Sequence, residues 1–336
     1  MGHGCVYGKQ SSVQRKGDRM IGAKKDTMKA VRIHSYGGPE VLVYEDVVLP
    51  RAITGEVLLR VHAACVNPAD WKTRNGPARP GATLPMILGW DVSGTVEALG
   101  PEVTEFQEGD TVFGMIRFPQ AGATYAEYVA APVSQIAHKP ANIDHIHAAA
   151  IPLAGLTAWQ ALFEKAHVTA GQTVLILGAA GGVGHLTVQL ARSQGAYVLG
   201  TASTHNIEFL HQIGVDQAID YTKTPLEAAV RNVDVVFDTV GGETRKDSLR
   251  IIRQGGTLVS ILVGRPSPEE AATGINVQGM LVQPNSAQLA QIAQLIDAGK
   301  VHVTVETVLP LAHARKAHEL SETHRTRGKI VLQVAE

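Results

Sequence analysis

The chain is poor in cysteine, and neither sign of charge is in excess. Its 336 residues include only two cysteines, Cys5 and Cys65, which cannot build a disulfide scaffold or a zinc site of four thiolates. Thirty Lys and Arg residues face 31 Asp and Glu residues, so the chain lacks the bulk positive charge that holds proteins to phosphate backbones. We therefore expect a soluble, cytoplasmic protein, and the charge argues against nucleic acid as a partner.

The first 27 residues differ in charge from the rest. They carry six basic and two acidic residues, a charge of +4 that leaves −5 on the remainder of the chain. They contain no apolar run, so they lack the core of a secretory signal and are too short and polar to span a membrane. We interpret residues 1–27 as a disordered or extraneous tail, with a transit peptide as the alternative, and expect the fold to begin at Met28.

The length predicts two domains, because a single hydrophobic core stops growing at roughly 250–300 residues. Residues 28–150 favour a compact, barrel-like β domain. Their strands are expected at 29–34, 41–47, 56–63, 92–98, 111–115 and 126–130, with Gly and Pro in the intervening turns.

Residues 151–290 alternate between strand and helix patterns, which require crossover helices and so predict a parallel sheet wound on both faces. The strands are expected at 173–177, 197–201, 233–238 and 257–262, and the helices at 185–193, 206–212, 244–252 and 286–298. Residues 291–336 end in a strand at 329–334 that can return to the first domain. The predicted fold class is α/β.

The segment 173–184 carries the clearest functional signal. An apolar strand runs directly into glycines, and a helix follows. Backbone amides and the positive helix end can then approach a pyrophosphate without obstruction by Cβ atoms. We predict a dinucleotide site formed by Gly178, Ala180, Gly181, Gly182, Val183 and Gly184.

The segment after the second strand bears on the choice of cofactor. An NAD site carries an acidic residue about 20 residues beyond the glycine loop, but residues 201–206 contain no carboxylate. Ser203 and Asn206 can donate hydrogen bonds to a 2′-phosphate, although no Arg or Lys lies in this stretch. The sequence favours NADPH over NADH.

From Met28 onward the chain resembles a zinc-independent medium-chain dehydrogenase/reductase of the quinone oxidoreductase, or ζ-crystallin-like, branch. The glycine-loop signature matches from Gly171 through Arg192, with Gln189 included. The other matching segments, in the family's order, are residues 55–61, 66–72, 89–94, 109–114, 125–128, 155–158 and 328–332.

The resemblance implies a GroES-like β-barrel catalytic domain, a Rossmann domain, and a cofactor in the cleft between them. It places Thr157 near the nicotinamide, and Ser203, Asn206 and Tyr221 near the adenosine phosphate. Asn206 departs from relatives that often carry Lys there. The family also suggests a homodimer that joins the two Rossmann sheets at residues 276–283, which would protect an open sheet edge.

Metal ligands are missing where zinc alcohol dehydrogenases have them. Asn67 and Trp90 stand in place of a Cys and a His ligand, and neither can hold zinc. Residues 115–124 form a short loop instead of a four-cysteine lobe. The pairs His145 with His147 and His313 with His318 lack a third partner at suitable spacing, so we interpret them as surface or packing residues. We expect no metal.

Without a Lewis acid, hydride addition to a quinone or to the β-carbon of an enone is easier than reduction of a simple ketone. Lys72 is the candidate donor to the anion that develops, because plant alkenal and enone reductases of this branch resemble the chain in having Lys there. Asn67 would position substrate or nicotinamide, and Asp70 would keep Lys72 charged. The alternative for Lys72 is an exposed surface lysine. Trp71, Trp90 and Phe118 line the substrate pocket or belong to the core.

The favoured function is an NADPH-dependent reductase of quinones or α,β-unsaturated carbonyls. The first alternative is an NADPH-binding structural or regulatory protein that touches RNA through its basic tail. The second is a zinc alcohol dehydrogenase, which would require bound metal.

Overall fold

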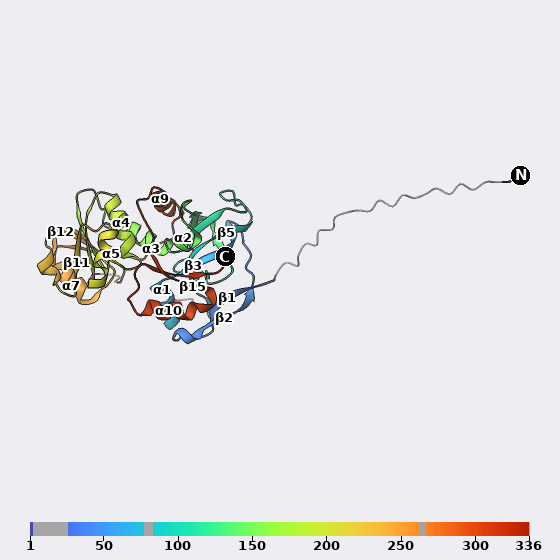
Figure 1. The fold of residues 1–336 in the computed structure, drawn as a ribbon, viewed down its shortest axis with the longest axis horizontal. Coiled ribbons are helices and arrows are strands. Elements are labelled where there is room, and N and C mark those ends of the chain that lie inside the picture. Colours follow the sequence, from blue (N-terminus) through green and yellow to red (C-terminus); the bar gives the residue numbers. More distant parts are fainter. Residues whose placement is uncertain (3–25, 77–82, 263–265, 336) are drawn as a thin grey trace.

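The computed structural model describes residues 1–2, 26–76, 83–262 and 266–335 (Figure 1). Most of the predicted tail, including Cys5, lies outside these residues. Cys65 is buried and carries a free thiol. No helix in the described ranges has the length and apolar character needed to cross a bilayer.

The first part of the chain forms two β-sheets. A three-stranded sheet has the order β2-β1-β4, and a seven-stranded sheet has the order β15-β16-β3-β5-β6-β8, with β7 also paired to β3. The early strands are β1 (Thr27–Ile33), β2 (Leu42–Val48), β3 (Glu56–Val66), β4 (Met86–Ile87), β5 (Asp91–Leu99), β6 (Thr111–Met115), β7 (Tyr128–Pro132) and β8 (Ile136–His138). Helices α1 (Pro68–Asn75) and α2 (His145–Ala149) belong to this lobe.

The end of the chain lies in the same lobe, where Figure 1 shows the red elements beside the blue and green strands. It comprises β15 (Val305–Pro310), α10 (Ala314–Glu322) and β16 (Lys329–Gln333). Strand β16 pairs antiparallel with β3, with Ile330 opposite Val66 and Leu332 opposite Ala64. Their buried apolar side chains form one core with those of β1 and α10.

The middle of the chain forms a parallel six-stranded sheet with the order β11-β10-β9-β12-β13-β14. This is the strand order of a dinucleotide-binding doubly wound fold. Its strands are β9 (Thr173–Leu177), β10 (Tyr197–Ala202), β11 (Gln217–Asp220), β12 (Val233–Asp238), β13 (Ile252–Ser260) and β14 (Asn276–Gly279). The helices are α3 (Pro152–Trp159), α4 (Gly184–Ser193), α5 (Ile207–Gln212), α6 (Leu226–Ala229), α7 (Gly242–Leu249), α8 (Pro268–Ala271) and α9 (Ser286–Asp297).

The predicted fold class is confirmed, and several predicted elements match closely. Strands β6, β9 and β12 have the predicted bounds. Other predicted bounds differ by one to three residues, and the largest error is at α7, which ends at Leu249, and β13, which begins at Ile252 rather than at residue 257. Ile251 and Ile252 are buried against the sheet, so tertiary packing overrides the helix pattern there.

The two lobes share one continuous core. Trp90, Phe113 and Met115 of the first lobe pack in the same buried cluster as α3 and the strand residues Val174 and Ile176. Helix α3 lies at the middle of the molecule in Figure 1, between the lobes. Segments from both lobes are therefore held close together around the glycine loop that follows β9.

Candidate active site at the glycine loop and Asn67

The loop between β9 and α4 has little room for side chains. Gly178 has a φ of +71°, which favours glycine. A Cβ at residue 184 would lie 2.3 Å from the carbonyl oxygen of Gly178, so the helix can start this close only with glycine. Residues 181–183 are half-buried and present their backbone at the surface. The loop therefore lets its backbone approach a ligand closely, and the pyrophosphate site at these residues stays a prediction.

A second turn, which follows β12, packs against the glycine loop, because a Cβ at residue 178 would lie 2.9 Å from Thr239 Oγ1. The carboxylate of Asp238 accepts hydrogen bonds from the backbone amides of Val240 and Gly241 and from the Ser260 hydroxyl. The Thr239 hydroxyl donates to the carbonyl of Leu177 at 2.7 Å. Buried Asp238 therefore shapes a turn that borders the cofactor loop, although the sequence did not single it out.

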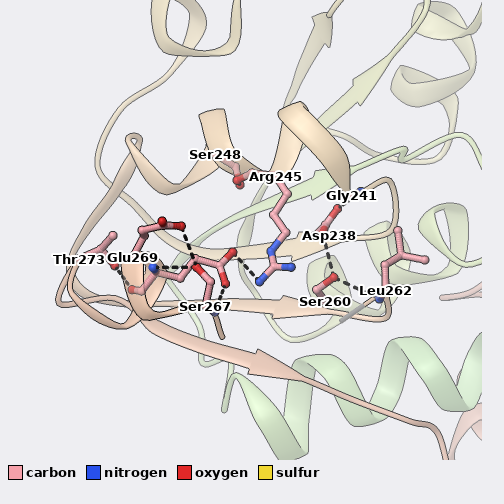
Figure 2. A network of polar contacts seen from close by, with 10 residues as sticks. Asp238, Gly241, Arg245, Ser248, Ser260, Leu262, Ser267, Glu269 and Thr273 are labelled. Atoms are coloured by element: carbon pink, nitrogen blue, oxygen red, sulfur yellow. Dashed lines mark hydrogen bonds and ion pairs between the residues drawn. The ribbon is translucent and has the colours of Figure 1, made fainter. Parts of the chain in front are cut away.

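An ion pair stabilises the segment beyond that turn. Arg245 of α7 is 7% exposed, and its Nη2 lies 2.6 Å from Glu270 Oε1 (Figure 2). Glu270 also accepts a hydrogen bond from the backbone amide of Ser267, in the capping box that begins α8. The pair ties α8 to α7 next to the predicted cofactor cleft.

Of the predicted adenosine-phosphate residues, Ser203 and Asn206 follow β10 and Tyr221 follows β11, and the structure adds a cation to them. Asn206 is buried, and its Oδ1 accepts a hydrogen bond from Arg327 Nε at 2.9 Å. The Arg327 guanidinium also lies 5.3 Å from the centroid of the Phe209 ring. Ser203 is half-buried, whereas Tyr221 is 61% exposed.

Sequence reasoning missed Arg327, because it considered only residues local to β10. Arg327 follows Asn206 by 121 residues and comes from the segment just before β16. It supplies the positive charge that residues 201–206 lack. Asn206, where relatives often carry Lys, is therefore hydrogen-bonded to an arginine that is distant in the sequence.

Asp220, at the end of β11, is a carboxylate that the structure brings close to the same end of the site. The hydroxyls of Thr204 and Thr222 donate to it at 2.6 Å each. These hydrogen bonds lower its pKa to about 2. Asp220 is therefore an ionised carboxylate whose charge is already engaged by hydroxyl donors.

Asn67 is the N-cap of α1 and is 1% exposed. Its amide nitrogen donates to Asp91 Oδ2 at 2.8 Å and to the carbonyl of Cys65 at 3.4 Å. Its Oδ1 accepts a hydrogen bond from Lys329 Nζ at 2.5 Å. Both hydrogens of the Asn67 side-chain amide are thus donated within the protein. What Asn67 can still offer a ligand is the second lone pair of its oxygen.

Two buried aspartates surround Asn67. Asp70 Oδ2 accepts the backbone amide of Asn67, and Asp91 Oδ1 accepts the backbone amide of Leu153 in α3. Burial raises the pKa of Asp70 to about 7 and that of Asp91 to about 6. Helix α3 also carries Thr157, which is buried and donates its hydroxyl hydrogen to the Leu153 carbonyl.

Lys72 lies in α1 and is exposed. Its ammonium lies 5.5 Å from the centroid of the Trp71 ring. The expectation that Asp70 holds Lys72 is wrong, because the described residues include no ion pair between them and Asp70 binds the Asn67 amide instead. Residues two apart on a helix do not face each other.

The candidate pocket aromatics divide between core and edge. Trp90 and Phe118 are buried, and their rings meet edge to face with centroids 5.2 Å apart. Trp71 is half-buried, donates to the Ser321 hydroxyl and contacts the ring of His324. Trp90 and Phe118 therefore belong to the core.

Two of the four histidines that the sequence analysis rejected as metal ligands, His145 and His318, have packing partners. The His145 ring stacks on His62 and bonds Ser93, while His318 bonds Tyr125 and Arg74. Within the described ranges, no group of three or more His, Cys, Asp or Glu residues could hold a metal ion. Asn67 and Trp90 occupy the positions of two zinc ligands, so the donor set present here does not fit a catalytic zinc.

Comparisons with known proteins agree with this architecture. Residues 54–141 match the family model for the alcohol dehydrogenase GroES-like domain, and residues 213–332 match the model for a zinc-binding dehydrogenase. The NADPH-dependent alkenal/one oxidoreductase of Arabidopsis thaliana is 36% identical, with 91% of this chain and 79% of that protein covered.

Quinone oxidoreductases are similar over a larger share of their length. That of Sus scrofa is 32% identical, with 91% of this chain and 97% of the relative covered. The solved quinone oxidoreductase structure from Coxiella burnetii is 37% identical, with a TM-score of 0.85 and with 92% of this chain and 99% of that one covered.

The chain belongs to the quinone oxidoreductase branch of the medium-chain dehydrogenase/reductase family. In this quinone oxidoreductase family member, the GroES-like strands position Asn67 and the doubly wound sheet positions the glycine loop.

Proposed function

We propose that the protein transfers a hydride from NADPH to a quinone or to the activated C=C bond of an α,β-unsaturated carbonyl compound. One observation carries this proposal. A glycine loop with room for a pyrophosphate lies next to a buried polar site, and no group of described residues there could hold a metal ion. The names of the relatives, an alkenal/one oxidoreductase and quinone oxidoreductases, support the same substrate classes.

The residues of the chain divide the work between binding and charge stabilisation. The glycine loop would hold the pyrophosphate, and Arg327 with Asn206 would hold the 2′-phosphate, where a guanidinium gives charge-assisted hydrogen bonds. The bound cofactor supplies the hydride. At the other end of the cofactor, the resemblance to the family places Thr157 near the nicotinamide. Asn67 would position the nicotinamide or the substrate.

Hydride addition to the β-carbon of an enone leaves negative charge on the carbonyl oxygen, and a proton must then be supplied. Lys72 remains our candidate for stabilising that oxygen or passing the proton, since an exposed ammonium at the α1 surface is free to turn towards a ligand. No zinc takes part in this proposal. Elemental analysis of the purified active protein should find less than a stoichiometric amount of zinc, and chelators should leave turnover intact.

The test is oxidation of NADPH and NADH against enones, alkenals, and ortho- and para-quinones. We expect turnover with at least one of these acceptor classes and a higher kcat/KM for NADPH. Inactivity against all of them, with NADPH binding intact, would favour the alternative of an NADPH-binding regulatory protein. RNA binding that is sensitive to salt and lost on removal of residues 1–27 would then identify its partner.

We also propose a homodimer in which β14 pairs with β14 of a second copy. Within the described residues β14 is at the end of the sheet order, and its free edge offers unpaired backbone groups. Leu281, just beyond the strand, is 56% exposed and would be covered by such an assembly. A cytoplasmic location, which rests on composition, stays a prediction.

A further inference from the structure

The segments around Lys329 are fastened to the cofactor loop and to the helix that follows it. The backbone amide of Gly328 donates to the carbonyl of Ala180 at 3.0 Å. Gln189 of α4 exchanges two hydrogen bonds with the backbone of His302, and Thr304 donates its amide to His185 of the same helix. The start of β16 therefore keeps a fixed position relative to the glycine loop.

Lys329, the first residue of β16, lies in the same lobe as Asn67, because β16 pairs with β3 and sets Ile330 opposite Val66. Its side chain is buried, with the residue 4% exposed, and its ammonium donates to Asn67 Oδ1 at 2.5 Å. Its stem packs on the glycine loop so closely that a Cβ at residue 182 would lie 2.9 Å from Lys329 Cδ. One side chain thus touches both the loop that binds the cofactor and the residue beside the nicotinamide position.

The contacts continue beyond Asn67. The Asn67 amide donates to Asp91, and Asp91 accepts the backbone amide of Leu153 at the start of α3, the helix that carries Thr157. The series runs from the glycine loop through Lys329, Asn67 and Asp91 to α3, and it joins three segments that surround the predicted nicotinamide site. Lys329, Asn67 and Asp91 are all buried, so solvent competes little for the hydrogen bonds between them.

We propose that Lys329 is a positioning residue that fixes Asn67 relative to the glycine loop, so that cofactor binding at the loop also orders the Asn67 end of α1. The inference rests on the proposed function. A lysine suits the position because its long stem packs on the glycine loop of the other lobe while its ammonium supplies donors to the Asn67 oxygen. Its charge also lies close to buried Asp91.

Hydrogen exchange measured with and without NADPH tests the proposal without any acceptor. In the unaltered protein, NADPH should slow exchange in peptides covering residues 178–184 and also in those covering 67–72. In Lys329→Met the protection of 178–184 should persist, and the protection of 67–72 should fall by at least about fivefold. Equal protection of 67–72 in both proteins would overturn the proposal.

Turnover measurements on a matched set of variants provide a second test. Lys329→Met removes the donor, Lys329→Gln keeps a neutral donor, and Lys300→Met removes an exposed lysine away from the site as the control. We expect kcat to fall at least tenfold in Lys329→Met, to recover in part in Lys329→Gln, and to stay unchanged in Lys300→Met, while the Kd for NADPH changes less than threefold throughout. Equal losses in the Met and Gln variants would overturn the positioning role.

The two proposals fail in different ways. If NADPH gives no protection at 178–184 in the unaltered protein, the proposed function fails. If it protects 178–184 but not 67–72, the function stands and the role of Lys329 is overturned. Should Lys329→Met not fold, Asn67→Leu replaces it: the proposal then expects NADPH to protect 178–184 but not 67–72, and unchanged protection of 67–72 overturns it.

Discussion

At the scale of single residues, the site is built from side chains whose hydrogen-bonding capacity is almost fully used inside the protein. Asn67 stands where zinc alcohol dehydrogenases carry a cysteine ligand, yet here its amide connects Lys329 to Asp91. Exposed Lys72 and half-buried Arg327 are the cations with freedom to meet a ligand.

Lys72→Met should lower kcat/KM for enones by about 100-fold if Lys72 stabilises or protonates the developing anion, which is the usual contribution of such a group. The Kd for NADPH should not change, because Lys72 lies outside the cofactor loop. Steady-state kinetics and fluorescence titration measure the two quantities. Enone turnover equal to that of the unaltered protein would show that Lys72 is an ordinary surface lysine.

Arg327→Gln should raise the Kd for NADPH by about tenfold and leave the Kd for NADH within twofold, since a charge-assisted hydrogen bond contributes roughly 1.5–3 kcal/mol. Isothermal titration calorimetry with both cofactors measures the difference. Arg250→Gln, which removes the exposed arginine directly after α7, serves as the control. A similar loss for both cofactors would place Arg327 away from the 2′-phosphate.

At the scale of elements, local signals were the most reliable. Strand β9, its glycine loop and α4 follow one another directly, so the pattern of apolar residues and glycines predicted them almost to the residue. The sequence analysis did not predict β11 or the end of helix α7, because these depend on neighbours in the sheet. Strand β14 was expected from family resemblance, and it lies at the edge of the sheet.

Leu281→Asp should convert a dimer into a monomer, because it places a charge in the apolar contact proposed beside β14. Light scattering after size-exclusion chromatography reports the mass directly. Ile53→Asp alters another exposed apolar residue, 66% exposed in the first lobe, and should leave the dimer intact. A dimer that persists in Leu281→Asp would exclude this edge as the interface.

At the scale of the whole molecule, the lobes are joined by a shared core and by polar side chains that connect distant parts of the chain. One such group is His318 of α10, which is fully buried between Arg74 and Tyr125. Burial, with a further contribution from the Arg74 charge, lowers the pKa of His318 to about 3. Because Arg74 can only donate, His318 accepts at Nδ1 and stays neutral in the fold.

His318 should make stability depend on pH. In the unfolded chain this histidine takes up a proton near pH 6.5, and in the folded protein it does not. The stability that neutral His318 contributes is therefore complete above pH 6.5 and is lost as the pH decreases towards 3. Relative to His318→Gln, the free energy of unfolding should decrease by about 1.4 kcal/mol per pH unit below 6.5. Urea unfolding of both proteins between pH 7.5 and 5 measures this. A constant difference over that range would contradict the assignment.

The sequence by itself determined the α/β class and the succession of strand β9, glycine loop and helix α4, because each of these depends on residue types at short spacings. Only the tertiary structure decided which distant residues meet. Arg327 reaches Asn206 across 121 residues and Lys329 reaches Asn67 across 262. Both contacts exist because β16 crosses back to pair with β3 after passing the glycine loop. The pattern of residues along the chain does not predict this path, because the path depends on how the two lobes pack.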